Sequence, residues 1–177
     1  MARVPSQEIA IRKARIEDAP VLCAAEQEIA RTPGLLVSQP DELSPRAFAA
    51  TIAALANGGG CYLVAEDGGR IVGHAMLEPM SLRAVSHVFR LTIVVHSGHW
   101  RRGIGTLMMK ALTAWATEAP AAHKIELSVR SSNEPAKRLY EKFGFVEEGR
   151  LRNRIRLADG GFVDDVTMAW FPKPRAA

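Results

Sequence analysis

The sequence predicts an α/β (mixed α+β) fold in a single domain, built on one twisted, mixed but mostly antiparallel sheet of about seven strands with about four flanking helices. Three observations support this: strand-like segments separated by a short turn in the middle of the chain, a helical repeat of apolar residues from residue 104, and a strand pair near the end turned at "ADGG". A length of 177 residues, 47% of them hydrophobic, suits one core. We expect the domain to span 7–172, with flexible termini at 1–6 and 173–177.

The first third of the chain reads as strand, helix, loop and helix. Residues 8–15, "EIAIRKAR", alternate between apolar and polar as a strand does, and residues 16–31 read as a helix. A loop rich in Pro and turn formers follows over 31–45. Ser44 and the proline after it predict a second helix, which "NGGG" ends at 57–60.

The middle of the chain predicts three consecutive strands. The segments "CYLVAE" (61–66) and "RIVGHAMLEPM" (70–80) are separated by "DGG", which is a strong hairpin signal. The segment "SHVFRLTIVV" (86–95) follows with the same strand-like composition. We therefore expect an antiparallel meander.

The second half adds two helices and three strands. A broad apolar stripe with helical spacing is formed by Ile104, Leu107, Met108, Ala111, Leu112 and Trp115. A strand is predicted at 123–130, a short helix in "NEPAKRLYEKFGF" (133–145), and a long hairpin over 150–171. The predicted order is one strand, two helices, three strands, a helix, a strand, a helix and two strands.

Composition restricts the possible partners. No run approaches the roughly 18 consecutive apolar residues of a membrane helix, and the start lacks the apolar stretch of a secretion signal. We expect a soluble, cytoplasmic protein that binds no membrane. The net charge of +4 favours a small polyanionic ligand and is too diffuse to indicate nucleic acid. The arginines of "GRLRNRIR" alternate with apolar residues, as on a solvated strand face or a subunit interface.

The stretch "HSGHWRRGIGTLMMKAL" (96–112) places cationic side chains and two glycines at a helix start. Such a helix N-terminus aims unpaired N–H groups and the positive end of its dipole at one point, which suits phosphate. Gly103 and Gly105 would let the backbone approach an anion, and Arg101, Arg102 and the Thr106 hydroxyl could join it. Without further context, the same residues could form a glycine-rich turn with solvated arginines.

Together, "LTIVVHSGHWRRGIGTLMMKAL" and "IELSVRSSNEPAKRLYEKFGFVEEGR" resemble the two central motifs of the GCN5-related N-acetyltransferase (GNAT) superfamily. In that superfamily a [Q/R]-x-x-G-x-[G/A] motif binds the pyrophosphate of acetyl-coenzyme A (acetyl-CoA). The glycines match, and Trp100 stands at the Gln/Arg position. The resemblance implies acetyl-CoA as cosubstrate, with contacts from Ile93, Val94, Val95, Trp100, Arg101, Arg102, Gly103, Ile104, Gly105, Thr106, Asn133, Lys137 and Tyr140.

The second motif implies a catalytic residue. The family places an Asn before its last helix and a Tyr on it, and here these are Asn133 and Tyr140. By resemblance Tyr140 is the general acid that protonates the departing CoA thiolate; a phenol with a pKa near ~10 suits that task. Spacing alone favours another reading, in which Tyr140 is part of the apolar face of this helix.

The sequence identifies the residues that would bind the acceptor amine less clearly than those that would bind acetyl-CoA. The segments "VGHAMLEPM" and "SHVFRLTIVV" and the ending "GFVEEGRLRNRIRLADGGFVDDVTMAW" resemble the branch of bacterial L-amino-acid N-acetyltransferases and related small-amine enzymes. The resemblance implies that the acceptor pocket is built from residues 31–43 and 72–90. Arg31 could grip a carboxylate, and Glu78 could bind an ammonium group or end a water relay that accepts its proton. His87 is the other candidate base. Each could equally be a surface or structural residue.

Three functions are compatible with these motifs. The first is acetyl transfer to the primary amine of a small molecule, with an L-amino acid as one option, by direct attack in a ternary complex. The second is a non-catalytic CoA or acyl-CoA binding module, and the third is acetylation of a protein N-terminus or peptide amine.

No metal is expected, because His96 and His99 lack a third ligand nearby. The long terminal hairpin and the resemblance favour a homodimer.

Overall fold

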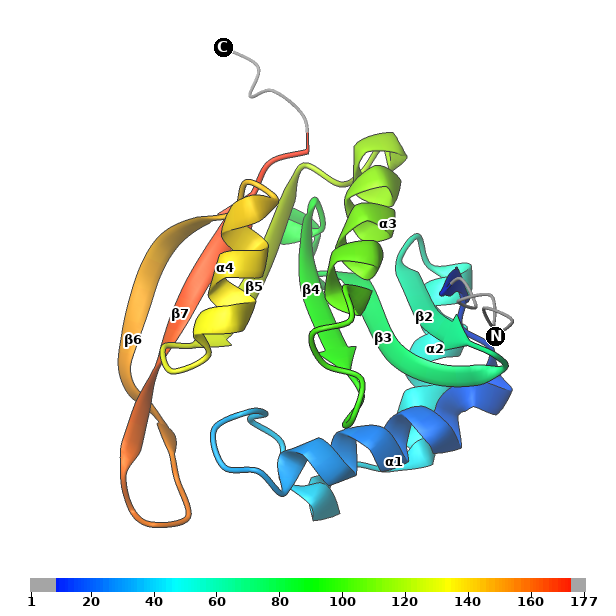
Figure 1. The fold of residues 1–177 in the computed structure, drawn as a ribbon. Helices are drawn as coiled ribbons and strands as arrows, with labels where there is room; N and C mark the ends of the chain where they lie inside the picture. Colours follow the sequence, from blue (N-terminus) through cyan, green and yellow to red (C-terminus); the bar gives the residue numbers. More distant parts are fainter. Residues whose placement is uncertain (1–8, 173–177) are drawn as a thin grey trace, which may run out of the picture.

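A seven-stranded sheet runs through the protein in the order β1-β2-β3-β4-β5-β7-β6 (Figure 1). This computed structural model describes residues 9–172, so the termini predicted to be flexible, 1–6 and 173–177, lie outside the described residues. Only the β4–β5 pair is parallel, and the other neighbours are antiparallel. The strands are β1 (Ala10–Lys13), β2 (Cys61–Asp67), β3 (Arg70–Pro79), β4 (Val88–Val95), β5 (Lys124–Arg130), β6 (Val146–Arg156) and β7 (Phe162–Trp170). The predicted mixed, mostly antiparallel sheet is confirmed.

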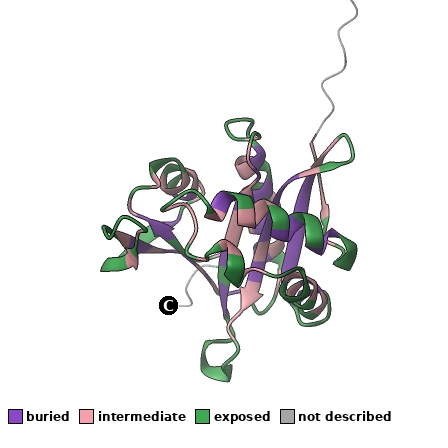
Figure 2. Cartoon of the chain, turned by 90° about the horizontal axis from the view of Figure 1, so that it is seen from below, coloured by how far each residue is buried: buried purple, intermediate pink, exposed green. Residues whose placement is uncertain are grey.

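Helices cover both faces of the sheet. They are α1 (Ala19–Ala30), α2 (Pro45–Asn57), α3 (Ile104–Glu118) and α4 (Glu134–Lys142), with short 3-10 helices η1 (Ile16–Asp18), η2 (Pro40–Glu42) and η3 (Arg83–Val85) in the connections. α3 and α4 share one hydrophobic cluster with the sheet, whereas α1 and α2 share a second cluster with β2 on the other face (Figure 1). Buried residues concentrate in the strands, and the outer helix faces are exposed (Figure 2). Within 9–172, no helix is long and apolar enough to cross a membrane.

The apolar face of α3 is rotated slightly from the predicted stripe. Ile104, Met108 and Leu112 are buried as predicted, but Met109 is also fully buried and Leu107 is 36% exposed. The helix packs on β1, β2, β3 and β4, and the residues that become buried place its core-facing side on Met108 and Met109 rather than on Leu107. Apolar spacing therefore located the helix correctly and its central direction only approximately.

The strands β4 and β5 separate after a short stretch of pairing. Their parallel register covers only Val88–Arg90 and Lys124–Glu126. Beyond this point β4 stays paired with β3 as far as Val95, and β5 stays paired with β7 as far as Arg130. The two strands diverge visibly in Figure 1. Among residues 9–172, one edge of β4 over Leu91–Val95 thus has no strand partner.

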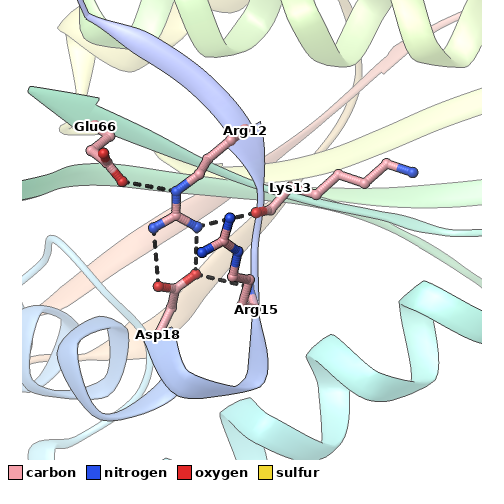
Figure 3. A network of polar contacts seen from close by, with 5 residues as sticks. All are labelled: Arg12, Lys13, Arg15, Asp18 and Glu66. Atoms are coloured by element: carbon pink, nitrogen blue, oxygen red, sulfur yellow. Dashed lines mark hydrogen bonds and ion pairs between the residues drawn. The ribbon is translucent and has the colours of Figure 1, made fainter. Parts of the chain in front are cut away.

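A charged network fixes the first strand to its neighbours (Figure 3). The Arg12 guanidinium on β1 contacts Asp18 Oδ2 at 2.7 Å and Glu66 Oε2 of β2 at 2.8 Å. Asp18 also accepts the Arg15 N–H at 2.8 Å. The hydrogen bond from Arg12 is the main cause that lowers the pKa of Asp18, with help from the Arg15 N–H. This network holds the edge strand and the start of α1 together.

Candidate active site

The N-terminus of α3 has no side-chain cap. Its N-cap residue, Gly103, adopts a left-handed φ of 78° and offers no side-chain hydrogen bond to the first turn. The first helical hydrogen bond runs from the Leu107 N–H to the Gly103 carbonyl at 3.0 Å. In contrast, Asn133 caps α4 by accepting the Ala136 N–H at 3.3 Å. The first-turn N–H groups of α3 therefore remain available to an anion, and the helix dipole favours one there.

Gly105 allows α3 and α4 to approach each other closely. A Cβ atom at this position would lie 3.0 Å from Leu139 Cδ2 of α4, which is tighter than an ordinary contact. At Gly103, in contrast, a Cβ atom would meet nothing within 4 Å, so only the left-handed backbone requires glycine. The two glycines thus have different roles, one in the turn and the other in helix packing.

A cavity of about 510 Å³ opens at this helix start. Its walls come from the end of β4, the loop 99–103, the first turn of α3, the start of α4, and residues 29, 35 and 36 beside α1. The predicted cofactor residues that line it are Ile93, Val94, Val95, Trp100, Arg101, Gly103, Ile104, Gly105, Thr106, Asn133 and Tyr140. The sheet topology therefore brings two motifs that are distant in sequence into one site.

Arg102 and Lys137 do not line this cavity. The Arg102 guanidinium contacts Asp67 Oδ2 at 2.7 Å and His99 Nδ1 at 2.9 Å. The Lys137 ammonium lies 3.3 Å from Glu134 Oε1 on the same helix. Both cations are thus engaged by neighbouring side chains, and Arg101 is the arginine that lines the cavity.

Tyr140 is both a core residue and a residue of the cavity wall. It is only 7% exposed, belongs to the hydrophobic cluster beneath α3 and α4, and packs with Phe145 at a ring distance of 6.0 Å. Burial raises the pKa of its phenol to about 12, although the nearby Arg130 charge opposes this shift. The phenol is therefore protonated at neutral pH, as a proton donor must be. The two readings of Tyr140 left open by the sequence are compatible.

A second, polar cavity of about 680 Å³ adjoins the first along β4. Thr92 lines the second cavity, and the next residue, Ile93, lines the first. Val37, Ser38 and Met80 contribute to its wall from the loops. Its charged residues are Arg90, Glu126, Arg130, Glu148, Arg154 and Asp165. The separation of β4 from β5 therefore places a polar chamber beside the anion-binding one.

A buried ion pair lies at the inner end of the polar cavity. Arg130 Nη1 lies 2.9 Å from Asp165 Oδ1, across the β5–β7 register, and the two residues are 8% and 6% exposed. Within residues 9–172, the buried Arg130 Nε has no hydrogen-bond partner. Asp164 instead pairs with Arg150 at the surface, so the two neighbouring carboxylates face opposite sides of the strand. Sequence reasoning did not single out Arg130.

The predicted acceptor residues lie outside both cavities. Arg31 is exposed just after α1, and Glu78 lies opposite Arg90 in the β3–β4 register. His87 is exposed before β4, with its ring 6.3 Å from that of His123. The predicted segments 31–43 and 72–90 contribute Ser38 and Arg90 to the polar lining of the second cavity, whereas most of its other polar residues come from β5, β6 and β7. Among residues 9–172, no group of three or more His, Cys, Asp or Glu side chains is arranged to hold a metal ion.

Comparisons with known proteins agree with this geometry. The chain is 33% identical to the L-amino acid N-acetyltransferase AaaT of Escherichia coli K12 over 107 residues, which is 60% of this chain and 65% of that protein. It is 37% identical to an N-alpha-acetyltransferase of Sulfurisphaera tokodaii over 109 residues, which is 56% of this chain and 63% of that protein. The matches thus span less than two thirds of these relatives.

A solved structure shares the fold over nearly the whole chain. This is yncA from Salmonella typhimurium, solved with its cofactor acetyl-CoA, which superposes with a TM-score of 0.87, 19% identity and 96% coverage of each chain. The family model described as "Acetyltransferase (GNAT) family" matches residues 25–145, which is more than half of the chain and covers the first motif and the second as far as Phe145. The chain therefore belongs to the GNAT acetyltransferase family.

Proposed function

We propose that this protein transfers the acetyl group of acetyl-CoA to the primary amine of a small molecule, by direct attack in a ternary complex. One observation carries the proposal: an uncapped helix N-terminus and a buried, protonated tyrosine line one cavity, and a polar cavity adjoins it along the open edge of β4. The first cavity suits a phosphorylated thioester and the second suits a charged acceptor.

The residues of the first cavity fit acetyl-CoA. The free N–H groups of Ile104, Gly105 and Thr106, with Arg101, suit the pyrophosphate, because several donors and a positive charge converge there. The open edge of β4 over Ile93–Val95 suits the amides of pantetheine, by strand-like pairing. When bound, acetyl-CoA supplies an activated acyl group and a thiol leaving group. Tyr140 would donate its phenolic proton to that sulfur.

The polar cavity is suited to an acceptor that carries a carboxylate as well as an amine. An unpartnered N–H on a buried guanidinium is costly, and an acceptor carboxylate would satisfy the Nε of Arg130. The relative from Escherichia coli is named as an L-amino acid N-acetyltransferase, which supports the same class. L-Amino acids are therefore our proposed acceptors.

The attacking amine must first lose a proton, and carboxylates of the polar cavity are placed for this task. Glu126 and Glu148 both line the cavity, and each contacts the Lys124 ammonium at 2.7 Å. Asp165 is engaged by Arg130. We assign the proton acceptor to Glu126 or Glu148, acting directly or through water, in place of Glu78 or His87.

A peptide or protein N-terminus is the second candidate acceptor, because the relative from Sulfurisphaera tokodaii is named as an N-alpha-acetyltransferase. A binding module without catalysis is disfavoured by the placement of Tyr140 in the cofactor cavity.

The deciding experiment is thiol release from acetyl-CoA with a panel of L-amino acids, their decarboxylated amines, polyamines, aminoglycosides and short peptides. We expect turnover with L-amino acids and much less with the decarboxylated amines. Preference for peptides would support the second candidate. Tight binding of acetyl-CoA with no turnover across the panel would indicate a binding module.

We also propose that the protein is a homodimer. β6 forms one edge of the sheet, is 11 residues long, and leaves Val146 and Leu151 exposed at 58% and 46%. Such an edge is suited to pairing with a second copy. A monomeric mass in solution at micromolar concentration would contradict this.

A further inference from the structure

A buried chain of hydrogen bonds crosses the protein behind the cofactor cavity. Glu26 Oε1 of α1 lies 2.8 Å from His74 Nε2 of β3, and His74 Nδ1 lies 2.9 Å from His96 Nε2 in the loop after β4. The chain ends where His96 Nδ1 lies 3.2 Å from the Ile71 carbonyl. His74 is 1% exposed and His96 is 6% exposed, so water does not substitute for these contacts.

These contacts require one more proton than two neutral imidazoles supply. The Ile71 carbonyl can only accept, so His96 Nδ1 carries a proton and, in the neutral ring, His96 Nε2 is an acceptor. His74 Nδ1 must then carry the proton of the next contact. A neutral His74 would have a bare Nε2 facing the carboxylate of Glu26, which is a contact between two acceptors. A third proton must therefore lie between His74 and Glu26.

The surroundings favour a neutral His96, so the third proton belongs to the pair of His74 and Glu26. Burial, together with the neighbouring His74, lowers the pKa of His96 to about 4. The other groups facing the chain are neutral: Tyr62 of β2, whose ring lies 6.1 Å from that of His74, and the Cys23 thiol of α1. Burial, with Glu26 adding to it, raises the pKa of both groups. His99 faces His96 from the loop side and is itself in contact with Arg102.

This chain of hydrogen bonds joins two walls of the cofactor cavity that are distant in sequence. Glu26 lies one helical turn before Ile29, which lines the cavity from α1. His96 begins the loop that supplies His99, Trp100 and Arg101 to the opposite wall, and its carbonyl accepts the His99 N–H at 3.1 Å. Breaking one of these hydrogen bonds should therefore shift the cavity wall formed by the loop relative to the wall formed by α1.

We propose that Glu26, His74 and His96 are positioning residues for the cofactor loop, and that His74 is held as an imidazolium by Glu26. The hydrogen-bond chain then connects the loop to α1 through two contacts of His74, one of them between charged groups, while a neutral His96 is also held to β3 by the Ile71 carbonyl. The role in cofactor binding rests on the proposed function, whereas the protonation state does not.

The Glu26→Gln variant tests whether a third proton lies between His74 and Glu26. A glutamine amide can donate to a bare His74 Nε2, so every contact is kept while the third proton is no longer needed. NMR of the imidazole nitrogens should show His74 protonated at both nitrogens in the wild type at pH 7.5 and at one nitrogen in the variant. Glu28→Gln, on an exposed position of the same helix, should leave the His74 signals unchanged. A neutral His74 in the wild type would overturn the assignment.

The pH dependence of the free energy of unfolding gives an independent test of the third proton. Unfolded His and Glu, with ordinary pKa values near ~6.5 and ~4.3, hold almost no proton above pH 7.5, whereas the folded pair holds one. Folding then takes up a proton, and stability must fall as pH rises. Between pH 7.5 and 8.5 the unfolding constant of the wild type should rise about tenfold more than that of Glu26→Gln. Equal slopes for the two proteins would contradict the extra proton.

The positioning role is tested by acetyl-CoA affinity, measured by calorimetry. Glu26→Ala should weaken binding about tenfold, Glu26→Gln should restore most of it, and Glu28→Ala should match the wild type. Wild-type affinity in folded Glu26→Ala would overturn the positioning role. If the wild type itself does not bind acetyl-CoA, the proposed function fails, and the protonation measurements still decide the state of His74.

Discussion

The indole Nε1 of Trp100 donates a hydrogen bond of 3.0 Å to the carbonyl of Val95. This contact closes the loop after β4 back onto the end of the strand, although Trp100 itself is 53% exposed. The indole stands where the family motif has Gln or Arg. It therefore acts on the loop conformation, and it uses a carbonyl at the strand edge that would otherwise be open to the cofactor.

Removing this donor should loosen the cofactor loop. Trp100→Phe keeps an aromatic ring but loses the N–H, and one hydrogen bond contributes about 0.5–1.5 kcal/mol. We expect acetyl-CoA affinity, measured by calorimetry, to fall by about two- to tenfold. Unchanged affinity would mean that the loop holds its conformation without the indole.

Gly103→Glu should weaken acetyl-CoA binding by several-fold or more, because it places a negative charge at the uncapped start of α3. The matched control is Gly160→Glu. Gly160 has a similar positive φ of 86° and equally open surroundings, but it lies in the turn between β6 and β7. Both variants carry the same backbone strain, so a loss of affinity common to both would argue against an anion site at Gly103.

The Arg130 guanidinium should distinguish acceptors by their carboxylate. Arg130→Lys keeps a cation beside Asp165 but removes the planar Nε–H. We expect the KM for an L-amino acid to rise about tenfold, as for one lost charge-assisted hydrogen bond, with little change for its decarboxylated amine. Equal shifts for both acceptors would place the acceptor carboxylate elsewhere.

Asp18→Asn should destabilise the fold by roughly 1–3 kcal/mol at pH 7, because Asp18 accepts from Arg12 and from the Arg15 N–H. The folded pKa of Asp18 is lowered, so its contribution is fully present above the unfolded pKa of ~3.9. It should disappear as pH falls from there through the folded pKa. Urea unfolding at pH 7 and pH 3 checks this, with the exposed Asp41→Asn as control. A difference that persists undiminished at pH 3 would contradict the charge-based explanation.

The sequence was sufficient for the order of strands and helices because local signals mark their ends. Ser44 caps α2 by accepting the Ala47 N–H, as its position before a proline predicted, and "DGG" turns the β2–β3 hairpin. The core-facing side of α3 was less well predicted, since Leu107 and Met109 are both apolar and only the packing of the helix on the sheet decides which of them is buried.

Local motifs in the sequence identify most residues that line the first cavity, whereas for the polar cavity they indicate two contributing segments, 31–43 and 72–90, and not its charged residues on β5, β6 and β7. Gly103, Asn133 and Tyr140 belong to local motifs, so their neighbours in sequence identify them. Arg130 is held by an ion pair with Asp165, which is 35 residues away in the sequence. His74 is likewise held by a contact with Glu26, which is 48 residues away. Such pairs depend on strand register and helix packing, which local patterns do not encode.

The central claim is that Tyr140 acts as proton donor in acetyl transfer at this site, and single-turnover kinetics of Tyr140→Phe test it most directly. Phenylalanine keeps the ring packed against Phe145 and removes only the hydroxyl. With the enzyme preloaded with acetyl-CoA and its best amine in excess, we expect the rate of thiol release to fall by about 10²–10⁴-fold, with nearly unchanged cofactor affinity. A loss nearer ~10-fold would still fit, because a thiolate with a pKa near ~8.5 is already a fair leaving group. A folded variant that transfers acetyl at the wild-type rate would contradict the account and reduce Tyr140 to a packing residue.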